Sequence, residues 1–226
     1  MTLLELDPDQ LLSTTRAVRK RLDFDRPVPL ELLRECVTMA LQAPSGSNIV
    51  TMRFVIVTDE DKRAAIGELY RSGYEDYRNS ERFAGSRPVA PDKQAQQDRV
   101  VDSADYLSSR FGEAPAIVVA CNLGADRPSA VAGMANILPA AWSFMLAARA
   151  RGLGTVWTSM HVARERELAQ LLGIPYERVA VGVVTPVAFT KGTDFKPAKR
   201  PAADDVIHWD GWRPLAHPLR ASTTSA

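Results

Sequence analysis

Apolar residues recur along the chain at two spacings, and each spacing predicts a different kind of element. Leu33, Cys36 and Ala40 repeat at intervals of three and four, which indicates an amphipathic helix that begins near Pro29. Other segments are short and continuously apolar, as in buried strands. The pattern predicts helices over residues 10–20, 29–41, 60–82, 100–111, 130–151 and 164–172, and strands over 53–58, 114–121, 178–187 and directly after Gly154. This alternation, without repeats or a clear linker, predicts one α/β or mixed α+β domain spanning 1–226.

Glycine and proline mark where these elements end. Pro139 lies inside the 130–151 helix and predicts a kink or a broken first turn. Gly152 is expected to cap the end of that helix. The stretch Gly152-Leu153-Gly154 does not fit a dinucleotide-binding fingerprint, because that motif follows a strand and opens a helix, whereas here a helix comes first.

A polar loop joins the 29–41 helix to the first buried strand. Pro44 ends the helix, and Gly46 lets the backbone turn sharply. Ser45, Ser47 and Asn48 then present short polar side chains. Such a loop either forms hydrogen bonds to the edge of a planar heterocycle or is an ordinary solvent loop.

Residues 80–97 are polar and contain Gly85 and two prolines, so we expect a mobile lid or surface insertion there. Four aromatic residues, Tyr70, Tyr74, Tyr77 and Phe83, either line the roof of a pocket or simply pack together. Residues 191–226 are rich in proline and polar residues and predict an extended C-terminal tail. Within this tail, His208–Trp212 suggests an edge strand and a turn.

Composition and charge exclude several classes of protein. The chain has 226 residues, 46% of them hydrophobic and 24% charged, which is typical of a globular protein. Lys and Arg total 28 against 27 for Asp and Glu, a net charge of +1. This balance argues against a nucleic-acid or membrane-surface binder.

Two cysteines and the N-terminal residues indicate the compartment. Cys36 and Cys121 lie in apolar segments without metal spacing, which indicates buried, reduced residues. Acidic residues stand where a signal peptide needs positive charge. Residues 134–150 are apolar but include Asn136 and Arg149, which indicates a buried helix and not a membrane span. We therefore expect a cytoplasmic protein.

Basic residues are concentrated in two places. Arg16, Arg19, Lys20 and Arg21 lie within six residues, and the second group is Lys196, Lys199 and Arg200. Arginine binds phosphate oxygens through paired hydrogen bonds, so the first cluster is either a phosphate site or a solvated surface.

The side chains offer no convincing catalytic group of their own. His161, His208 and His217 are far apart and not at ligand spacing with Cys or Glu, so we expect no metal site. Neither a G-x-S-x-G elbow nor a Walker loop is present. If the protein is an enzyme, a cofactor carries its chemistry.

These features occur in the order found in a known family. The basic stretch Thr14–Arg21, the helix that ends in A-P-S-G-S-N at 43–48, and the strand Phe54–Val57 resemble the N-terminal half of the FMN-dependent nitroreductase family. The 137–151 helix with G-L-G-T at 152–155, and then Lys199-Arg200-Pro201, resemble its C-terminal half. The resemblance covers roughly residues 12–210, and Thr14–Asp23 looks most like an actinobacterial branch of NAD(P)H nitroreductases.

The resemblance implies a set of cofactor-binding residues. Arg16 and Arg19 match the residues that hold the FMN phosphate and ribityl chain, with Ala17 in place of the usual serine; a shifted register would use Arg21. Lys199 and Arg200 match a second phosphate clamp. The residues that match the flavin-bordering segments are Pro44, Ser45, Gly46, Ser47 and Asn48 in one loop, and Trp157, Thr158 and Ser159 in another, with Ser159 nearest flavin N5.

The resemblance also implies a fold and an activity. The fold is a central, mostly antiparallel sheet flanked by helices, with a long central helix at a homodimer interface. The activity is ping-pong hydride transfer from NADPH or NADH through flavin N5 to a small electron-poor acceptor such as a nitroaromatic or a quinone. Alternatives are a reductive dehalogenase, a flavin-degrading enzyme and a protein that sequesters FMN without turnover. A sequestering protein would require Tyr74 and Tyr77 to cover the reactive face of the flavin.

One departure from the family concerns the residues after Asn48. The family often continues with a Gln-Pro-Trp segment, whereas Ile49–Met52 stands here. Because this chain lacks that tryptophan and proline, the resemblance does not indicate which acceptor the protein prefers.

Overall fold

The computed structural model describes residues 3–124, 126 and 130–212. It contains two units, Met1–Phe195 and Lys196–Ala226. The first unit contains the sheet and all the α-helices of the described residues. Each unit is considered by itself.

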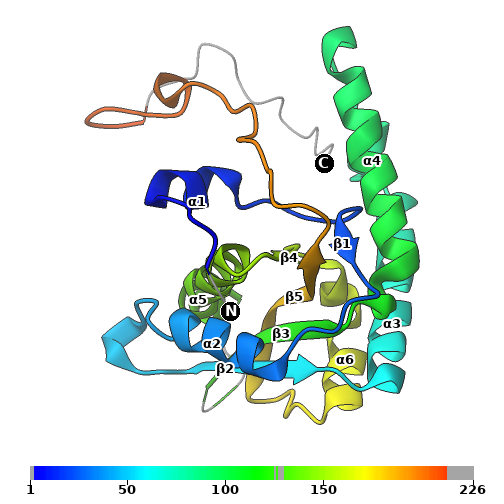
Figure 1. Cartoon of the computed structure of the whole chain (residues 1–226), viewed down its shortest axis with the longest axis vertical. Helices are drawn as coiled ribbons and strands as arrows, with labels where there is room; N and C mark the ends of the chain where they lie inside the picture. The colour runs from blue at the N-terminus through cyan, green and yellow to red at the C-terminus, as the bar shows by residue number, and fades with distance from the viewer. Residues whose placement is uncertain (1–2, 125, 127–129, 213–226) are drawn as a thin grey trace, which may run out of the picture. The chain divides into compact units, whose positions relative to one another are not determined.

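An antiparallel sheet forms the centre of the first unit (Figure 1). The strand order is β1-β5-β3-β2, and β4 also pairs with β5. Every strand pairing is antiparallel, which confirms the predicted sheet. The strands are β1 (Leu22–Asp23), β2 (Met52–Val57), β3 (Ala116–Leu123), β4 (Leu153–Thr155) and β5 (Val179–Thr190).

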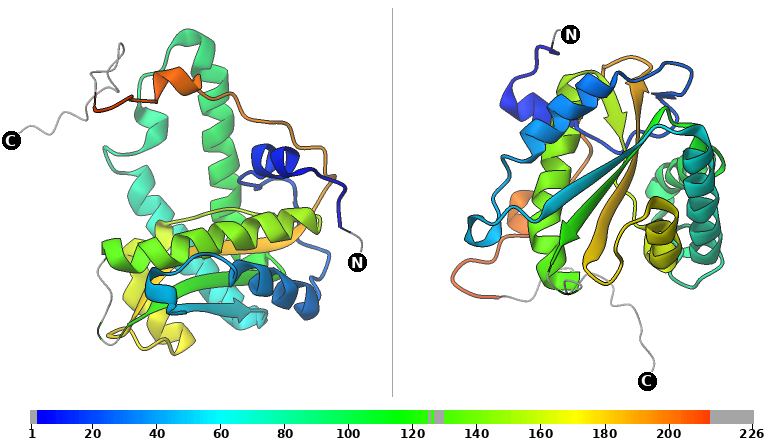
Figure 2. Two further views of the ribbon diagram at one scale, coloured as in Figure 1. Left: turned by 90° about the vertical axis from the view of Figure 1, so that its left-hand side faces the viewer. Right: turned by 90° about the horizontal axis from the view of Figure 1, so that it is seen from below.

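Helices cover both faces of this sheet (Figure 2). On one face lie α2 (Leu30–Ala40) and α5 (Ala130–Ala150), and on the other lie α3 (Glu60–Arg78) and α6 (Glu165–Leu172). The helix α4 (Pro91–Arg110) packs beside α3. The observed fold is therefore the predicted α+β arrangement.

The alternation of side chains along β3 explains why both faces are covered. Ala116 and Val118 pack against α2 and α5, while Ile117, Val119 and Cys121 pack against α3 and α6. Successive side chains of a strand point to opposite faces, so a strand apolar at every position has to be buried on both. The two cysteines, Cys36 and Cys121, are accordingly free, buried and on opposite faces of the sheet.

The N-terminal helix is shorter than predicted. The helix α1 spans Pro8–Thr14, and Thr15 already has extended backbone angles. Val18 is buried because its N–H donates to the Thr155 carbonyl at 2.9 Å, and not because it lies on a helix face. The prediction of a helix through residue 20 was therefore wrong, since pairing with a distant strand overrides the local pattern.

The polar insertion is more helical than predicted. The helix α4 begins at Pro91, so most of the second half of residues 80–97 is helix and not coil. A 3-10 turn over Ala84–Ser86 lies between α3 and α4. The long helix α5 runs through Pro139, so this proline does not mark a broken first turn.

Glycines end two helices as predicted, with left-handed backbone angles at Gly152 (φ 74°) and Gly173 (φ 66°). In the second unit, a 3-10 turn spans Ala203–Asp205, and residues 196–212 contain no strand. The edge strand predicted at His208–Trp212 is therefore absent, because Asp210 adopts a positive φ of 57° that interrupts extended backbone. The rest of the predicted tail, 213–226, lies outside the described residues.

Candidate functional site

The basic N-terminal segment lies beside the end of β4. Ala17 forms an isolated parallel bridge with Thr155, and Val18 is hydrogen-bonded to the same residue. The side chains of Arg16 and Ala17 are exposed, and that of Arg19 is half-buried. Two segments far apart in the sequence are thereby held side by side, and the resemblance assigned both to the cofactor.

The segment after β4 is held by β5. Val156 N–H donates to Thr185 Oγ1 at 3.1 Å, and Thr158 Oγ1 donates to the Val184 carbonyl at 2.6 Å. Val156 and Thr158 are buried, while Trp157 and Ser159 are exposed. The alternation places the exposed side chains on the face away from β5, where they are free to contact a ligand.

A cavity of about 190 Å³ joins this segment to the helices α3 and α4. Its floor is Val156–Met160, and Arg19 enters from the N-terminal segment. Its roof contains all four aromatic residues of the set predicted from the sequence. The roof residues are Tyr70, Tyr74, Tyr77, Phe83, Ala84, Val100, Val101 and Ala104.

The roof tyrosines are fixed by polar and aromatic contacts. Tyr74 Oη donates to Asp105 Oδ1 at 2.7 Å, and Arg78 pairs with the same carboxylate at 3.2 Å. Tyr70 stacks on Phe111 with ring centroids 4.1 Å apart. Burial raises the pKa of Tyr70 to about 12, against a smaller opposing effect of Arg19. Burial together with Asp105 also raises the pKa of Tyr74. Both hydroxyls therefore stay protonated at neutral pH. Such tyrosines can line a cavity, but they are poorly suited to act as acid–base catalysts.

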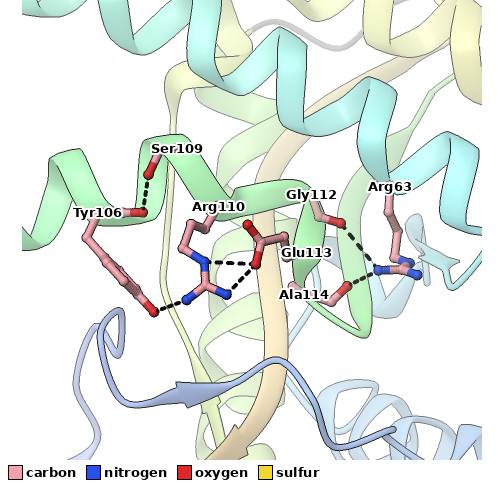
Figure 3. A network of polar contacts seen from close by, with 7 residues as sticks. All are labelled: Arg63, Tyr106, Ser109, Arg110, Gly112, Glu113 and Ala114. Carbon is pink, nitrogen blue, oxygen red and sulfur yellow. Dashed lines mark hydrogen bonds and ion pairs between the residues drawn. The ribbon is translucent and has the colours of Figure 1, made fainter.

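The base of the α3–α4 pair is anchored by arginines (Figure 3). Arg63 donates to the carbonyls of Gly112 and Ala114 at 3.3 and 2.8 Å. Arg110 donates to Glu113 at 2.8 Å and to Tyr106 Oη at 2.6 Å. The two helices are thus tied to the start of β3.

An open hollow of about 820 Å³ lies at the same base. It is larger than the aromatic cavity, but its cations are already engaged. Arg63 and Arg110 bind the partners shown in Figure 3, and Arg71 pairs with Glu68 and Glu75. These groups hold the fold together and leave little charge for a ligand, so the smaller cavity is the better candidate site.

The polar loop at 44–48 lies elsewhere in the unit and does not line the aromatic cavity. Gly46 N–H donates to Asn136 Oδ1 of α5 at 3.0 Å. Ser47 and Asn48 have positive φ values of 53° and 55°. Left-handed angles at two successive non-glycine residues are costly, and such strain is concentrated at functional sites. Pro44, Ser45 and Gly46 complete this exposed or half-exposed loop.

The remaining predicted cations have different surroundings. Arg21 pairs with Asp194 at 2.6 Å and donates to the Lys191 carbonyl at 2.9 Å, so it holds the start of the tail. The shifted register, in which Arg21 binds a phosphate, would require these contacts to break. Lys199 and Arg200 belong to the second unit.

His161 is buried directly after the cavity floor. Neither ring nitrogen has a hydrogen-bond partner in the described part of the chain. Burial lowers the pKa of this imidazole from its ordinary 6.5, and the Glu165 carboxylate opposes the shift only in part. The folded protein therefore holds His161 neutral.

This burial predicts a pH-dependent stability. Below pH 6.5 the unfolded chain takes up a proton at His161 that the folded chain refuses, so stability falls as the pH is lowered from that value. Well above pH 6.5 His161 is neutral in both states and contributes no pH dependence. We expect His161→Leu to flatten the thermal unfolding temperature against pH below 6.5, while Val162→Ala, at an exposed neighbouring position, leaves the slope unchanged. Equal slopes in all three proteins would contradict this assignment.

Thiol and metal chemistry have little support among the described residues. Burial raises the pKa of Cys36 to about 11 and that of Cys121 to about 12, which keeps both as unreactive thiols. The described ranges contain no group of three His, Cys, Asp or Glu side chains placed to hold a metal ion. Nor do they contain a helix long and apolar enough to cross a membrane.

Comparisons with known proteins identify the family. The profile described as the Nitroreductase family matches residues 12–186, and the chain belongs to that family. A protein of Archaeoglobus fulgidus is 26% identical over 206 residues, which is 90% of this chain and 97% of that protein; its provisional name is NADH dehydrogenase/NAD(P)H nitroreductase.

Solved structures show the same fold. An oxidised iodotyrosine deiodinase bound to FMN and 3-iodo-L-tyrosine is 25% identical with a TM-score of 0.66, covering 89% of this chain and 98% of that one. A variant of the FMN- and NADPH-dependent nitroreductase NfnB, derived from sphigopyxis sp. strain HMH, is 20% identical with a TM-score of 0.65, covering 92% and 100%. At 20% identity, the similarity to the NfnB variant shows a shared fold and no more.

Proposed function

We propose that the protein is an FMN-dependent NAD(P)H oxidoreductase that reduces a small electron-poor aromatic acceptor. The observation that carries this proposal is the cavity in which Arg19, the Trp157–Ser159 segment and the tyrosine roof meet. Family membership supports oxidoreductase chemistry in general. A roof of tyrosines that stay neutral suits a reaction that takes its chemistry from a cofactor.

The residues present fit FMN. The exposed guanidinium of Arg16 matches a phosphate dianion, and Arg19 lies close enough to the cavity to reach the ribityl chain or ring. The exposed side chains of Trp157 and Ser159 offer one planar and one polar contact to a flat heterocycle. When bound, the flavin would supply hydride exchange at N5, first with NADPH or NADH and then with the acceptor.

The chain's own residues would bind and orient. Ser159 is proposed to hydrogen-bond near N5, and Thr158 fixes that segment through its bond to Val184. The aromatic roof would exclude water and stack on each ligand in turn. No side chain has to act as acid or base.

A homodimer would explain why the loop at 44–48 lies outside the aromatic cavity of its own protomer. Inside one protomer this loop rests on α5 and outside the cavity, so we propose that it borders the flavin of a partner subunit. Ile49 and Val50 follow it and are 60% and 53% exposed, which is unusual for two adjacent apolar side chains and suits a covered interface. The apolar helix α5 would share that interface. Lys199 and Arg200 of the second unit remain predicted phosphate ligands on the family resemblance alone.

A reductive dehalogenase is the second candidate, because the iodotyrosine deiodinase shares the fold. An amino-acid substrate carries an ammonium group that a carboxylate usually binds. The residues that line the described cavity include Arg19 but no Asp or Glu. The lining therefore favours the oxidoreductase acting on quinones or nitroaromatics. A cytoplasmic location remains a prediction that rests on the two buried thiols.

Flavin content and reduction test the proposal. The purified protein is expected to be yellow, and anaerobic NADPH or NADH should bleach the flavin band, with colour returning when p-benzoquinone or nitrobenzene is added. A colourless protein that takes up no FMN would refute flavin chemistry. A yellow protein that neither nicotinamide bleaches would instead be a flavin-sequestering protein.

A further inference from the structure

The loop at 44–48 is anchored beyond both of its ends by apolar packing. Met52 follows the loop and belongs to the same apolar cluster as Ile137 of α5, and Ala43, which precedes the loop, packs against that cluster. The loop itself projects beyond the ends of α2 and β2 (Figure 1). The residues between the two anchors are exposed or half-exposed, so burial does not determine where the middle of the loop lies.

Hydrogen bonds inside the loop determine its shape but not its position. Asn48 N–H donates to the Ser45 carbonyl at 3.2 Å, and the N–H of the following residue donates to the Gly46 carbonyl at 3.1 Å. Among the described residues, a single hydrogen bond joins the loop at 44–48 to a helix or a strand. It is the bond from Gly46 N–H to Asn136 Oδ1 of α5, at 3.0 Å. The position of the turn therefore depends on Asn136.

This bond is the last step of a hydrogen-bond chain that begins in the sheet. Asn122 lies on β3 and is buried, and its Oδ1 accepts a hydrogen bond from Thr51 Oγ1 at 2.6 Å. Thr51 Oγ1 in turn accepts a hydrogen bond from Asn136 Nδ2 at 3.3 Å. We refer to these three residues as the Asn136 network. It connects the centre of the sheet, through α5, to the backbone of the exposed loop.

The Asn136 network can form in one orientation only. A hydroxyl group has a single hydrogen to donate, and that of Thr51 is directed at Asn122. Thr51 can therefore only accept from Asn136, which has to turn its NH₂ group toward Thr51 and its carbonyl oxygen toward the loop. A buried amide thus determines the orientation of the Asn136 side chain, and that orientation determines where Gly46 N–H points.

The residues after Gly46 require such support, because their backbone is strained. Ser47 and Asn48 have φ values of 53° and 55°, in the left-handed region that residues with a Cβ avoid. Backbone of this kind persists only where the surrounding structure holds it. In the part of the chain that the structure describes, the side chains of Ser45, Ser47 and Asn48 form no hydrogen bond. They are therefore available to a ligand.

We propose that the Asn136 network holds this strained turn in the conformation that borders the flavin of the partner subunit. Asn136 and Thr51 are then positioning residues of the cofactor site, because they act through Gly46 and are not themselves flavin ligands. The inference rests on the proposed function, since the flavin proposed there is the ligand of the turn. Asn136 lies on α5, so one helix serves both the proposed dimer interface and the cofactor site.

The first test uses variants that differ by one hydroxyl group. Thr51→Val removes the hydroxyl and keeps the shape of the side chain, whereas Thr51→Ser keeps the hydroxyl. Asn136→Ala removes the bond to Gly46 itself. The control is Thr38→Val, because Thr38 is an exposed residue of α2 whose hydroxyl bonds only the Arg34 carbonyl of its own helix. FMN affinity is measured by titrating the FMN-free proteins and following the quenching of flavin fluorescence.

We expect Thr51→Val and Asn136→Ala each to weaken FMN binding by about fivefold to tenfold, the effect of losing one hydrogen bond. Thr51→Ser and Thr38→Val should keep the affinity of the unaltered protein. Combining Thr51→Val with Asn136→Ala should cost no more than Asn136→Ala alone, because both changes break the same network. Unchanged affinity in the two single variants, or losses that multiply in the double variant, would overturn the proposal.

Hybrid dimers test whether the network acts on the flavin of the partner. One subunit carries Arg16→Ala together with Arg19→Ala, the other carries Asn136→Ala, and different affinity tags isolate the hybrid. If the loop serves the partner's flavin, one site has all the defects and the other has none. Half of the FMN should then bind with the affinity of the unaltered protein. Two weakened sites would mean that the loop acts within its own subunit, which contradicts the proposal.

Hydrogen exchange separates this inference from the proposed function. Exchange of the Gly46 amide hydrogen can be followed by NMR in protein without FMN. It should become about fivefold faster in Thr51→Val and Asn136→Ala, and it should not change in Thr51→Ser. If the unaltered protein takes up no FMN, the proposed function falls, and these rates alone decide whether the network holds the turn. If FMN binds and is reduced normally but neither variant changes affinity or exchange, the network falls alone.

Discussion

Replacing Arg16 by alanine is expected to weaken FMN binding by roughly tenfold to a hundredfold, because a charge-assisted hydrogen bond contributes about 1.5–3 kcal/mol. Arg16 is exposed next to the residues that pair with Thr155, so its guanidinium can reach a phosphate beside the cavity floor. Arg200→Ala tests the second predicted phosphate ligand, for which we expect a similar loss of affinity. Titration of the FMN-free protein, followed by quenching of flavin fluorescence, measures both.

The matched control for these variants is Arg34→Ala. Arg34 is an exposed arginine on α2 that pairs with Glu31, and its loss changes the net charge by the same amount. Arg16→Lys should retain part of the affinity, since lysine keeps the charge but not the paired hydrogen bonds. FMN binding that is equal in Arg16→Ala, Arg200→Ala and the control would show that the phosphate lies elsewhere.

Gly73→Ala is expected to destabilise the protein by about 1–3 kcal/mol, although alanine normally favours a helix over glycine. A Cβ at Gly73 would lie 2.4 Å from the Met160 carbonyl oxygen, which is backbone and cannot rotate away. The helix α3 or the segment after Ser159 must therefore move. The thermal unfolding temperature should fall by roughly 5 °C, and the folded protein should bind FMN less tightly.

Ser109→Ala on the exposed side of α4 is the control, and it should change stability by less than about 0.5 kcal/mol. The direction in which Gly73→Ala changes the thermal unfolding temperature tests this prediction. An unfolding temperature equal to or above that of the unaltered protein would mean that α3 and the floor of the cavity adjust to the methyl group without loss.

The sequence predicts the elements whose pattern is set by burial. The strand β3 is apolar at every position because helices cover both faces, and α2 has a clean apolar stripe because its other side meets water. By contrast, residues 91–97 are almost entirely exposed, so they show no apolar period although they are helical. Pro91 at the first turn was the available signal, since proline favours that position.

The candidate site was predicted in part. The tyrosines, Phe83, Arg19 and the Trp157–Ser159 segment meet in one cavity. Val100, Val101 and Ala104 were missed, although apolar residues at intervals of three and four on an otherwise polar helix indicate a buried face. The separation of the 44–48 loop from this cavity could not be foreseen, because sequence order does not tell which side of a sheet a loop occupies.

The strand β5 pairs with β1, β3 and β4, and it also holds Thr158 beneath the cavity. Among the strands of the described residues, it is the last to leave the ribosome. At about 5–20 residues per second, roughly 3–13 s separate the synthesis of β3 from that of β5. During that interval β3 can pair only with β2, and its other edge is unpaired. The sheet, and with it the floor of the aromatic cavity, is therefore completed only late in the synthesis of each new molecule.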